Sequence, residues 1–270
     1  MGSRPLWYTS LAILRTTAET MRRDELTDCL GGLLEPGRFK DYCPNGLQVE
    51  GREEIRTLAV AVSASLDAIE QALASGADAL LVHHGWFWRG EEARIVGGRR
   101  ARIALALANG LNIYGYHLPL DAHPELGNNA QLARRLGWLE EGRAGEQDLL
   151  CHGRPVEQVT LDQLACRLET TLGRPPMVIP GLDRARQVRR LAWCSGGAQD
   201  YFHDAIALGV DAFVTGEASE WIYHAARESG VSFIAAGHHA TERYGVQAVG
   251  AYLESRFGLA CHFLDSGNPI

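Results

Sequence analysis

A segment of this chain occurs twice, and the repeat restricts the possible folds. Residues 58–84 align without a gap on residues 191–217 at a constant offset of 133, with eight identical positions among 27. Alanine supplies half of the matches, so identity alone proves little. The positions of the polar residues are stronger evidence: the second strand of one copy ends in His83-His84 and that of the other in Thr215-Gly216-Glu217. Each copy is followed by a helix pattern and a further strand pattern, and these later strands end in His117-x-x-x-Asp121 and His238-x-x-x-Glu242. The repeat predicts an internal duplication of a β-α-β unit.

The periodicity elsewhere extends this pattern. Apolar runs predict strands over residues 58–62, 79–82 and 111–116, and helical spacing predicts helices over 24–34, 66–75 and 99–108. Thr160 and Gln163 form a capping box for a further helix that ends at Gly173. Strands that alternate with helices are typical of an α/β fold with a mostly parallel sheet.

We therefore expect an α/β fold of two similar α/β domains related by internal duplication, which face each other across a shared site. The first domain is expected over residues 21–125 and the second over residues 126–270. Residues 1–20 have a different character, because they contain Gly2-Ser3-Arg4-Pro5 and a Thr-rich stretch ahead of the helix pattern that starts near Met21. They are predicted to be a disordered extension or the product of an upstream start codon.

Composition excludes several classes of protein. The chain has 33 acidic and 26 basic residues, a net charge of −7, which disfavours binding along nucleic acid or an anionic membrane. No apolar run approaches the ~20 residues of a membrane-spanning helix. The six cysteines are scattered without a CxxC pair, which excludes a zinc ribbon and predicts reduced thiols in a cytoplasmic protein.

Histidines and carboxylates gather where the predicted strands end. In α/β folds, active sites lie at the carboxyl ends of parallel strands. Imidazole nitrogens bind divalent metals and a carboxylate can bridge two ions, so this is the inventory of a dinuclear site for Fe, Mn, Zn or Ni. The residues concerned are His83, His84, His117, Asp121, Glu217, His238, His239 and Glu242.

The spacing of these residues refines the expectation. Neighbouring residues of a regular strand point to opposite faces, so His83 and His84 require either two ions or an irregular strand end. His238 and Glu242 share one face if a helix opens there. Pro119 predicts a loop rather than a helix over His117 to Asp121.

Four motifs in order along the chain resemble one family over about residues 21 to 270. They are DYCPNGLQVEG at 41–51, VHHGWFW at 82–88, YHLPLD at 116–121 with LGNNA at 126–130, and TGE at 215–217 with GHHATE at 237–242. These motifs resemble the YbgI-like dinuclear metal centre proteins, also called GTP cyclohydrolase 1 type 2 homologues. The resemblance implies two similar α/β domains with a site for two metal ions per chain in the cleft between them, and a ring-shaped homohexamer. It also implies that the metal ligands are His83, His84, Asp121, His238 and Glu242.

Other residues near these motifs keep two interpretations each. His117 either orients a ligand or moves a proton, or else is a hydrogen-bonded loop residue. Glu217 is either a general base or the N-cap of a helix that starts near Ala218. His239 is expected to point away from the metals or toward a substrate cleft.

The residues after the histidine pair are also ambiguous. Trp86, Phe87 and Trp88 either stack on a purine or pack against another subunit or in the core. The arginines that follow either hold a phosphate or cover a solvated helix face; they are Arg89, Arg94, Arg99, Arg100 and Arg102. Cys43 is interpreted as structural.

The first functional hypothesis is a metal-dependent hydrolase of a nucleotide or another phosphorylated small molecule, with Glu217 or His117 moving the proton. The family name implies GTP ring opening, although the chain has no phosphate loop of the GxxxxGK[ST] kind. The second hypothesis is a non-enzymatic metal-binding scaffold or a metal-delivery protein. A nucleic-acid-associated factor is suggested only by the implied ring and is disfavoured by the charge.

Overall fold

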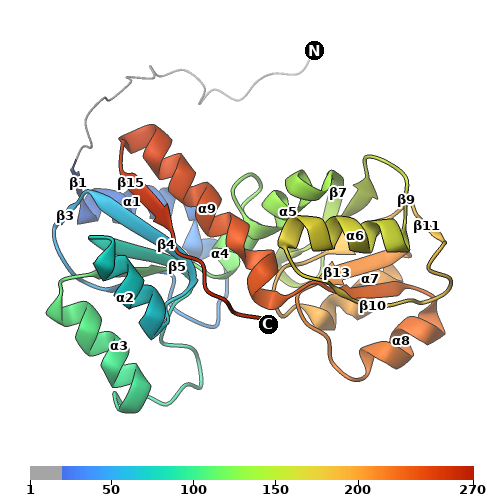
Figure 1. The fold of residues 1–270 in the computed structure, drawn as a ribbon, viewed down its shortest axis with the longest axis horizontal. Coiled ribbons are helices and arrows are strands. Elements are labelled where there is room, and N and C mark those ends of the chain that lie inside the picture. Colours follow the sequence, from blue (N-terminus) through green and yellow to red (C-terminus); the bar gives the residue numbers. More distant parts are fainter. Residues whose placement is uncertain (1–19) are drawn as a thin grey trace.

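The structure, a computed structural model, describes residues 20–270. It is a mixed α/β fold with a five-stranded sheet on one side and a six-stranded sheet on the other (Figure 1). The predicted extension over residues 1–20 lies, apart from Thr20, outside the described residues. None of the helices formed by residues 20–270 has both the length and the apolar character needed to cross a bilayer.

The five-stranded sheet has the order β15-β4-β5-β6-β2, and its strands β15, β4, β5 and β6 are parallel. Its elements are β2 (Gly46–Val49), β4 (Thr57–Ser63), α2 (Leu66–Ala74), β5 (Ala79–His84), α3 (Gly97–Ala108), β6 (Asn112–Gly115) and β15 (Ala260–Phe263).

Alternate residues of β4 explain how this sheet is covered. Leu58 and Val60 pack with α1 (Arg23–Leu34) and α9 (His238–Phe257), whereas Ala59 and Ala61 pack with α2 and α3. Successive side chains of a strand point to opposite faces of the sheet. The uninterrupted apolar run over residues 58–62 is therefore buried on both faces.

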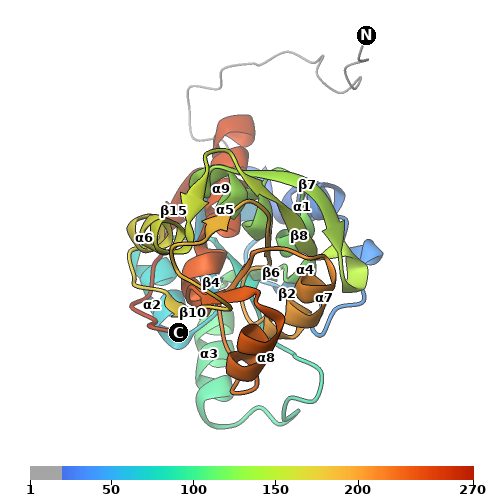
Figure 2. The same cartoon turned by 90° about the vertical axis from the view of Figure 1, so that its right-hand side faces the viewer.

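The six-stranded sheet has the order β10-β14-β13-β12-β8-β7, with β12, β13 and β14 parallel. Figure 2, in which the right-hand side of Figure 1 faces the viewer, shows this sheet in front. Helices α5 and α6 cover one face, and α7 and α8 cover the other. The elements are α5 (Asn128–Leu136), β7 (Trp138–Ala144), β8 (Leu150–Pro155), α6 (Leu161–Leu172), β10 (Met177–Ile179), β12 (Leu191–Trp193), α7 (Phe202–Ala207), β13 (Ala212–Thr215), α8 (Ile222–Ser229) and β14 (Ser232–Ala235).

The remaining elements are short. Strand β1 (Met21–Arg22) pairs with β3 (Glu54–Ile55), and β9 (Val159–Thr160) pairs with β11 (Gln187–Val188). The other short helices are α4 (Leu118–Ala122), η1 (Pro36–Arg38), η2 (Glu146–Asp148) and η3 (Gln199–Tyr201).

The two copies of the repeat occupy equivalent positions in the two sheets. Leu58 lies opposite Ala79 in the first parallel pair, and Leu191 lies opposite Ala212 in the second. Both pairs therefore keep the same register at the offset of 133. The second copy has a shorter helix, because α7 is preceded by the 3-10 turn η3. An internal duplication remains the interpretation that accounts for this shared register.

The C-terminal segment contributes to the first sheet, so a single boundary after residue 125 does not separate the two sheets. Strand β15 pairs with β4 in the first sheet, although residues 126–270 are expected to form the second domain. Helix α9 leads the chain back, since its residues Val246, Val249 and Leu253 are buried against that sheet. Edge pairing between distant segments leaves no local sequence signal.

Candidate metal centre

The predicted site residues converge at the carboxyl ends of strands from both sheets. His83 and His84 end β5, and His117 follows β6. On the other side, Glu217 follows β13 and His238 opens α9 directly after β14. Parallel strands of two facing sheets thus bring residues far apart in the sequence to one place.

The carboxylate of Glu242 lies at the centre of the cluster. Its Oε1 is 3.3 Å from Nε2 of His83, and its Oε2 is 3.2 Å from Nε2 of both His84 and His238. Nε2 of His83 is also 3.6 Å from Oδ1 of Asp121. Glu242 is therefore shared by two groups of possible ligands, each with its atoms within 4.8 Å of one another: His83, Asp121 and Glu242, and His84, His238 and Glu242.

The adjacent residues His83 and His84 both reach the cluster, although neighbouring residues of a regular strand point to opposite faces. The rings of His83 and His84 lie 4.6 Å apart and approach the two different oxygens of one carboxylate. Glu242 lies one turn after His238 on α9, as the spacing predicts. The prediction of a loop at Pro119 is wrong, because Leu118–Ala122 forms α4 with Pro119 in its first turn, where proline is tolerated.

In His83, His84 and His238, the ring nitrogen that points away from Glu242 is Nδ1, and it contacts another protein group. Nδ1 of His83 donates to the carbonyl oxygen of Tyr116 at 3.0 Å, and Nδ1 of His238 lies 2.6 Å from Oε1 of Glu217. Nδ1 of His84 lies 3.2 Å from Oγ of Ser63. A carbonyl oxygen can only accept, so the neutral His83 ring keeps its lone pair on Nε2, toward Glu242. Metal-ligating histidines are held in this manner.

Two buried atoms of the cluster have oppositely charged or polar neighbours at 3.2–3.3 Å but no well-directed hydrogen bond within the described residues. They are Nε2 of His83, whose residue is 0% exposed, and Oε2 of Glu242, whose residue is 2% exposed. Buried polar groups without partners are costly, and a cation placed among them removes the cost. The nitrogen and oxygen donors suit divalent ions such as Zn, Mn or Fe. The residues present therefore fit a divalent metal.

The charges of the cluster shift the pKa values of its histidines. Burial lowers the pKa of His83, but the carboxylates of Asp121 and Glu242 outweigh burial and raise it to about 9. Burial also lowers the pKa of His238, but the carboxylates of Glu242 and Glu217 outweigh burial and raise it to about 9. Burial and the neighbouring imidazoles lower the pKa of His84 to about 3. Protons on His83 and His238 thus balance the carboxylates when no metal is bound.

Asp41 belongs to the site, although residue types and spacing gave no reason to select it. Its side chain is buried and its Oδ1 accepts from Nδ1 of His117 at 2.7 Å. Its Oδ2 accepts from the backbone nitrogen of Leu118 at 2.9 Å and from Nδ2 of Asn45 at 2.8 Å. Burial raises the pKa of Asp41, but these hydrogen bonds and the His117 ring lower it to about 2. The only signal for Asp41 was its place in the DYCPNG motif.

The structure also narrows the interpretations of Glu217 and His239. Glu217 is not the N-cap of a helix, because α8 begins at Ile222 with Trp221 at the N-cap. Instead its carboxylate holds His238. His239 points away from the cluster, and its Nε2 lies 2.9 Å from Oδ1 of Asp265.

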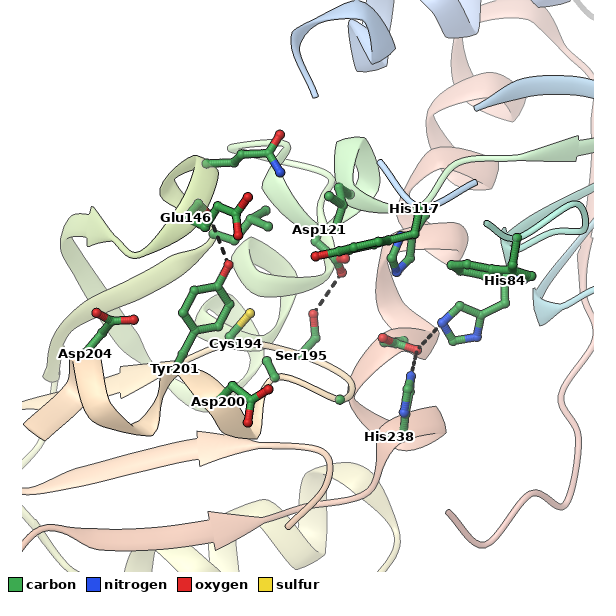
Figure 3. A pocket seen from close by; sticks show the side chains of 18 residues that line it. His84, His117, Asp121, Glu146, Cys194, Ser195, Asp200, Tyr201, Asp204 and His238 are labelled. Carbon is green, nitrogen blue, oxygen red and sulfur yellow. Dashed lines mark hydrogen bonds and ion pairs between the residues drawn. The ribbon is translucent and has the colours of Figure 1, made fainter. Parts of the chain in front are cut away.

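A cavity of about 740 Å³ opens beside the cluster. His84, His117, Asp121 and His238 line it together with residues that follow β12 (Figure 3). Trp88 also lines the cavity, whereas Trp86 is buried in the core and donates through Nε1 to the carbonyl oxygen of Ala64.

Cys43 is buried, which raises the pKa of its thiol to about 12 and agrees with a structural role.

Comparison with known proteins identifies the family of this chain. The family model Duf34/NIF3 (NGG1p interacting factor 3) matches residues 21–269. A protein of Neisseria meningitidis serogroup A named GTP cyclohydrolase 1 type 2 homolog is 54% identical over 250 residues, which cover 92% of this chain and 99% of that protein.

Solved structures show the same likeness. The protein ybgI, described as of unknown function, is 45% identical with a TM-score of 0.89 over 93% of this chain and 100% of its own. A protein of Thermus thermophilus is 37% identical with a TM-score of 0.85 over the same shares. The chain belongs to the DUF34/NIF3 family.

Proposed function

We propose that this protein is a dinuclear metal-dependent hydrolase of a small molecule. The observation that supports it is the shared carboxylate of Glu242, which is approached on both oxygens by histidine nitrogens whose outer nitrogens are already held. One ion would be held by His83, Asp121 and Glu242, and the other by His84, His238 and Glu242. Two divalent ions, when bound, supply Lewis acidity and lower the pKa of a water molecule.

His117 is the residue that moves a proton. Its Nδ1 donates to the ionised carboxylate of Asp41, so the neutral ring keeps its lone pair on Nε2. The ring lies on the wall of the cavity, 5.1 Å from the ring of His83 and 4.9 Å from that of Trp88. Glu217 acts through His238, whose ring it orients.

The names of the relatives suggest the reaction. The relatives are named after GTP cyclohydrolase. That activity hydrolyses a carbon–nitrogen bond in a purine ring, and we propose a reaction of this kind for the present protein. We also propose a homohexamer, as the resemblance implies. A cytoplasmic location is proposed from the scattered cysteines, which favour reduced thiols. Light scattering of the purified protein tests the assembly.

The test is a hydrolysis screen of the metal-loaded protein on purine bases, nucleosides, nucleotides and simple esters. We expect turnover that disappears with a chelator. The His117→Gln variant should keep its metal and lose about 100-fold in rate, which is typical of a removed acid or base. His239→Gln, which changes the adjacent histidine outside the cluster, should retain the rate. Turnover that survives removal of the metal would contradict the proposal, and metal without turnover would favour the scaffold hypothesis.

A further inference from the structure

Two buried asparagines open α5, and the proposed chemistry does not use them. Asn128 and Asn129 belong to the LGNNA motif, and both are 0% exposed. A buried amide is costly unless its N–H and C=O groups find hydrogen-bond partners. The partners of these two side chains therefore indicate what each side chain does.

Asn128 joins two helices that carry candidate metal ligands. Its Nδ2 donates to Oδ1 of Asp121 on α4 at 2.9 Å, and its Oδ1 accepts from the backbone nitrogen of Gly245 on α9 at 2.9 Å. A backbone nitrogen can only donate, so the amide oxygen must face α9 and the amide N–H groups must face Asp121. A Cβ atom at position 245 would contact the Asn128 amide. The glycine therefore allows this amide to lie against α9.

A second donor acts on the same oxygen of Asp121. Ser195, in the loop after β12, donates through Oγ to Oδ1 of Asp121 at 3.0 Å (Figure 3). The backbone nitrogen of Ser195 donates in turn to Oδ1 of Asn129 at 2.9 Å, and Nδ2 of Asn129 donates to the carbonyl oxygen of Asp121 at 3.3 Å. The Asp121 carboxylate cannot rotate without breaking these bonds. Carboxylates that bind metal are held by such hydrogen bonds.

The group of candidate ligands that contains Asp121 is the more buried of the two. All three of its residues are buried, whereas both histidines of the other group are partly exposed. The two groups share only Glu242, so a change in the position of Asp121 acts on the buried group. The histidines of the other group are held by Ser63 and Glu217, outside this network of hydrogen bonds.

We infer that Asn128 is a positioning residue, which holds Asp121 against α9 and thereby determines how tightly the buried group binds its ion. The ion of the other group does not depend on this amide. The inference rests on the proposed function, because the ligands are those assigned there, and it adds the residue that controls the affinity of one of the two sites.

The test is a manganese titration of the full chain followed by electron paramagnetic resonance. Two ions in wild type should give a spectrum broadened by the magnetic coupling between them. Asn128→Ala should bind the ion of the buried group at least about tenfold more weakly, as is typical when a partner of a metal ligand is removed. At a manganese concentration that just fills both sites of wild type, the variant should show mainly the resolved hyperfine lines of an isolated ion.

Two further variants separate positioning from folding. Ser195→Ala removes the other donor to Asp121 with a small change of volume, and it should weaken the same ion alone. Asn112→Ala removes an equally buried amide, whose three hydrogen bonds lie at the end of β6 away from His117. It should lose stability and hold both ions.

Three results would overturn the inference. Asn128→Ala binds both ions as wild type does, it loses both ions together, or its loss of metal is matched by that of Asn112→Ala. Where Asn128→Ala does not fold, Ser195→Ala decides, and a wild-type affinity for both ions in that variant would overturn the inference.

A double-mutant cycle on metal-free protein separates this inference from the proposed function. Asn128→Ala and Asp121→Ala should change the free energy of unfolding in urea non-additively, because the two side chains share a hydrogen bond. Additive changes would overturn the assigned contact even if the protein binds two ions. Wild type that binds no manganese would overturn the proposed function and the claim about affinity, while the cycle would still show whether Asn128 holds Asp121.

Discussion

At the scale of single residues, the site depends on charges that balance one another. Glu242 is almost fully buried, and its pKa lies well below the ordinary value: burial raises it, but His83 and His84 outweigh burial and lower it. Protonated His83 and His238 supply the balancing charge without metal. Metal ions bound by the proposed ligands would therefore replace these protons.

The first prediction concerns pH. A protonated imidazole cannot bind metal, and the pKa values of His83 and His238 are raised to about 9. Protons must therefore leave on binding at any pH below about 9, and the affinity falls as the pH falls. We expect manganese to bind at least about tenfold more weakly at pH 6 than at pH 8. Calorimetry in buffers of different ionisation enthalpy would count the released protons, and an affinity independent of pH would contradict this description.

The second prediction concerns Asp41. Its pKa in the folded protein is about 2, against an ordinary value of 3.8. A lowered pKa stabilises the fold above the unfolded value, and this contribution is lost as the pH falls from about 4 to about 2. Asp41→Asn should lower the free energy of unfolding at pH 7 by about 1–2 kcal/mol.

Urea denaturation at pH 7 and pH 2 measures this effect. The difference between wild type and Asp41→Asn should shrink at the lower pH. Asp28→Asn, an equal change of charge at an exposed position of α1, is the control. An equal loss of stability at both values of pH would show that Asp41 acts through shape rather than charge.

At the scale of elements, the loop after β12 determines where Glu242 can lie. Gly196 has a φ of +68°, and a Cβ atom there would contact Oε1 of Glu242. Its backbone nitrogen donates to Oγ1 of Thr241 at 2.9 Å, and its carbonyl oxygen accepts from the backbone nitrogen of Gly216 at 2.8 Å. The loop is thus fixed against the beginning of α9.

Gly196→Ala is the third prediction. It should displace the Glu242 carboxylate and weaken metal binding by about tenfold or more, in addition to about 1 kcal/mol of backbone strain. Gly209→Ala is a matched control, because Gly209 has a φ of +65° and open space around the position of a Cβ atom. Both variants should lose stability in thermal denaturation, and only Gly196→Ala should lose metal affinity. Equal metal affinity in both would contradict the assigned contact.

Local pattern predicted the central elements of this fold well. The helix from Thr160 to Gly173 has the expected capping box and ends as expected, and the buried strands of both copies of the repeat were found. The sequence could not reveal which distant strand β15 would join, because pairing at a sheet edge depends on the whole assembled layer. The strand-end histidines were visible because they interrupt apolar runs, whereas Asp41 lies in a loop and meets His117 only in three dimensions.

At the scale of the whole molecule, α9 connects the two halves. It carries His238 at its first position and Glu242 one turn later. Its residues Ala240 and Tyr244 pack in the core of the six-stranded sheet, and its later residues pack on the five-stranded sheet. The residues proposed to hold metal therefore come from segments on both sides. Metal binding should stabilise the folded chain as one unit.

The fourth prediction follows from this arrangement. A ligand at 100 times its dissociation constant adds about 2.7 kcal/mol to the stability of the native state. For a chain of this size, saturating metal should raise the Tm by about 5–10 °C. Scanning calorimetry with and without a chelator measures the shift. Metal that binds stoichiometrically without changing the Tm would contradict a site built from both halves.

The most direct measurement is the metal content of the loaded protein by elemental mass spectrometry, for wild type, Glu242→Gln and His239→Gln. The shared carboxylate predicts about two ions per chain in wild type and in His239→Gln, and a loss of both ions together in Glu242→Gln. Two ions retained in Glu242→Gln, or none in wild type, would contradict a dinuclear centre organised around Glu242.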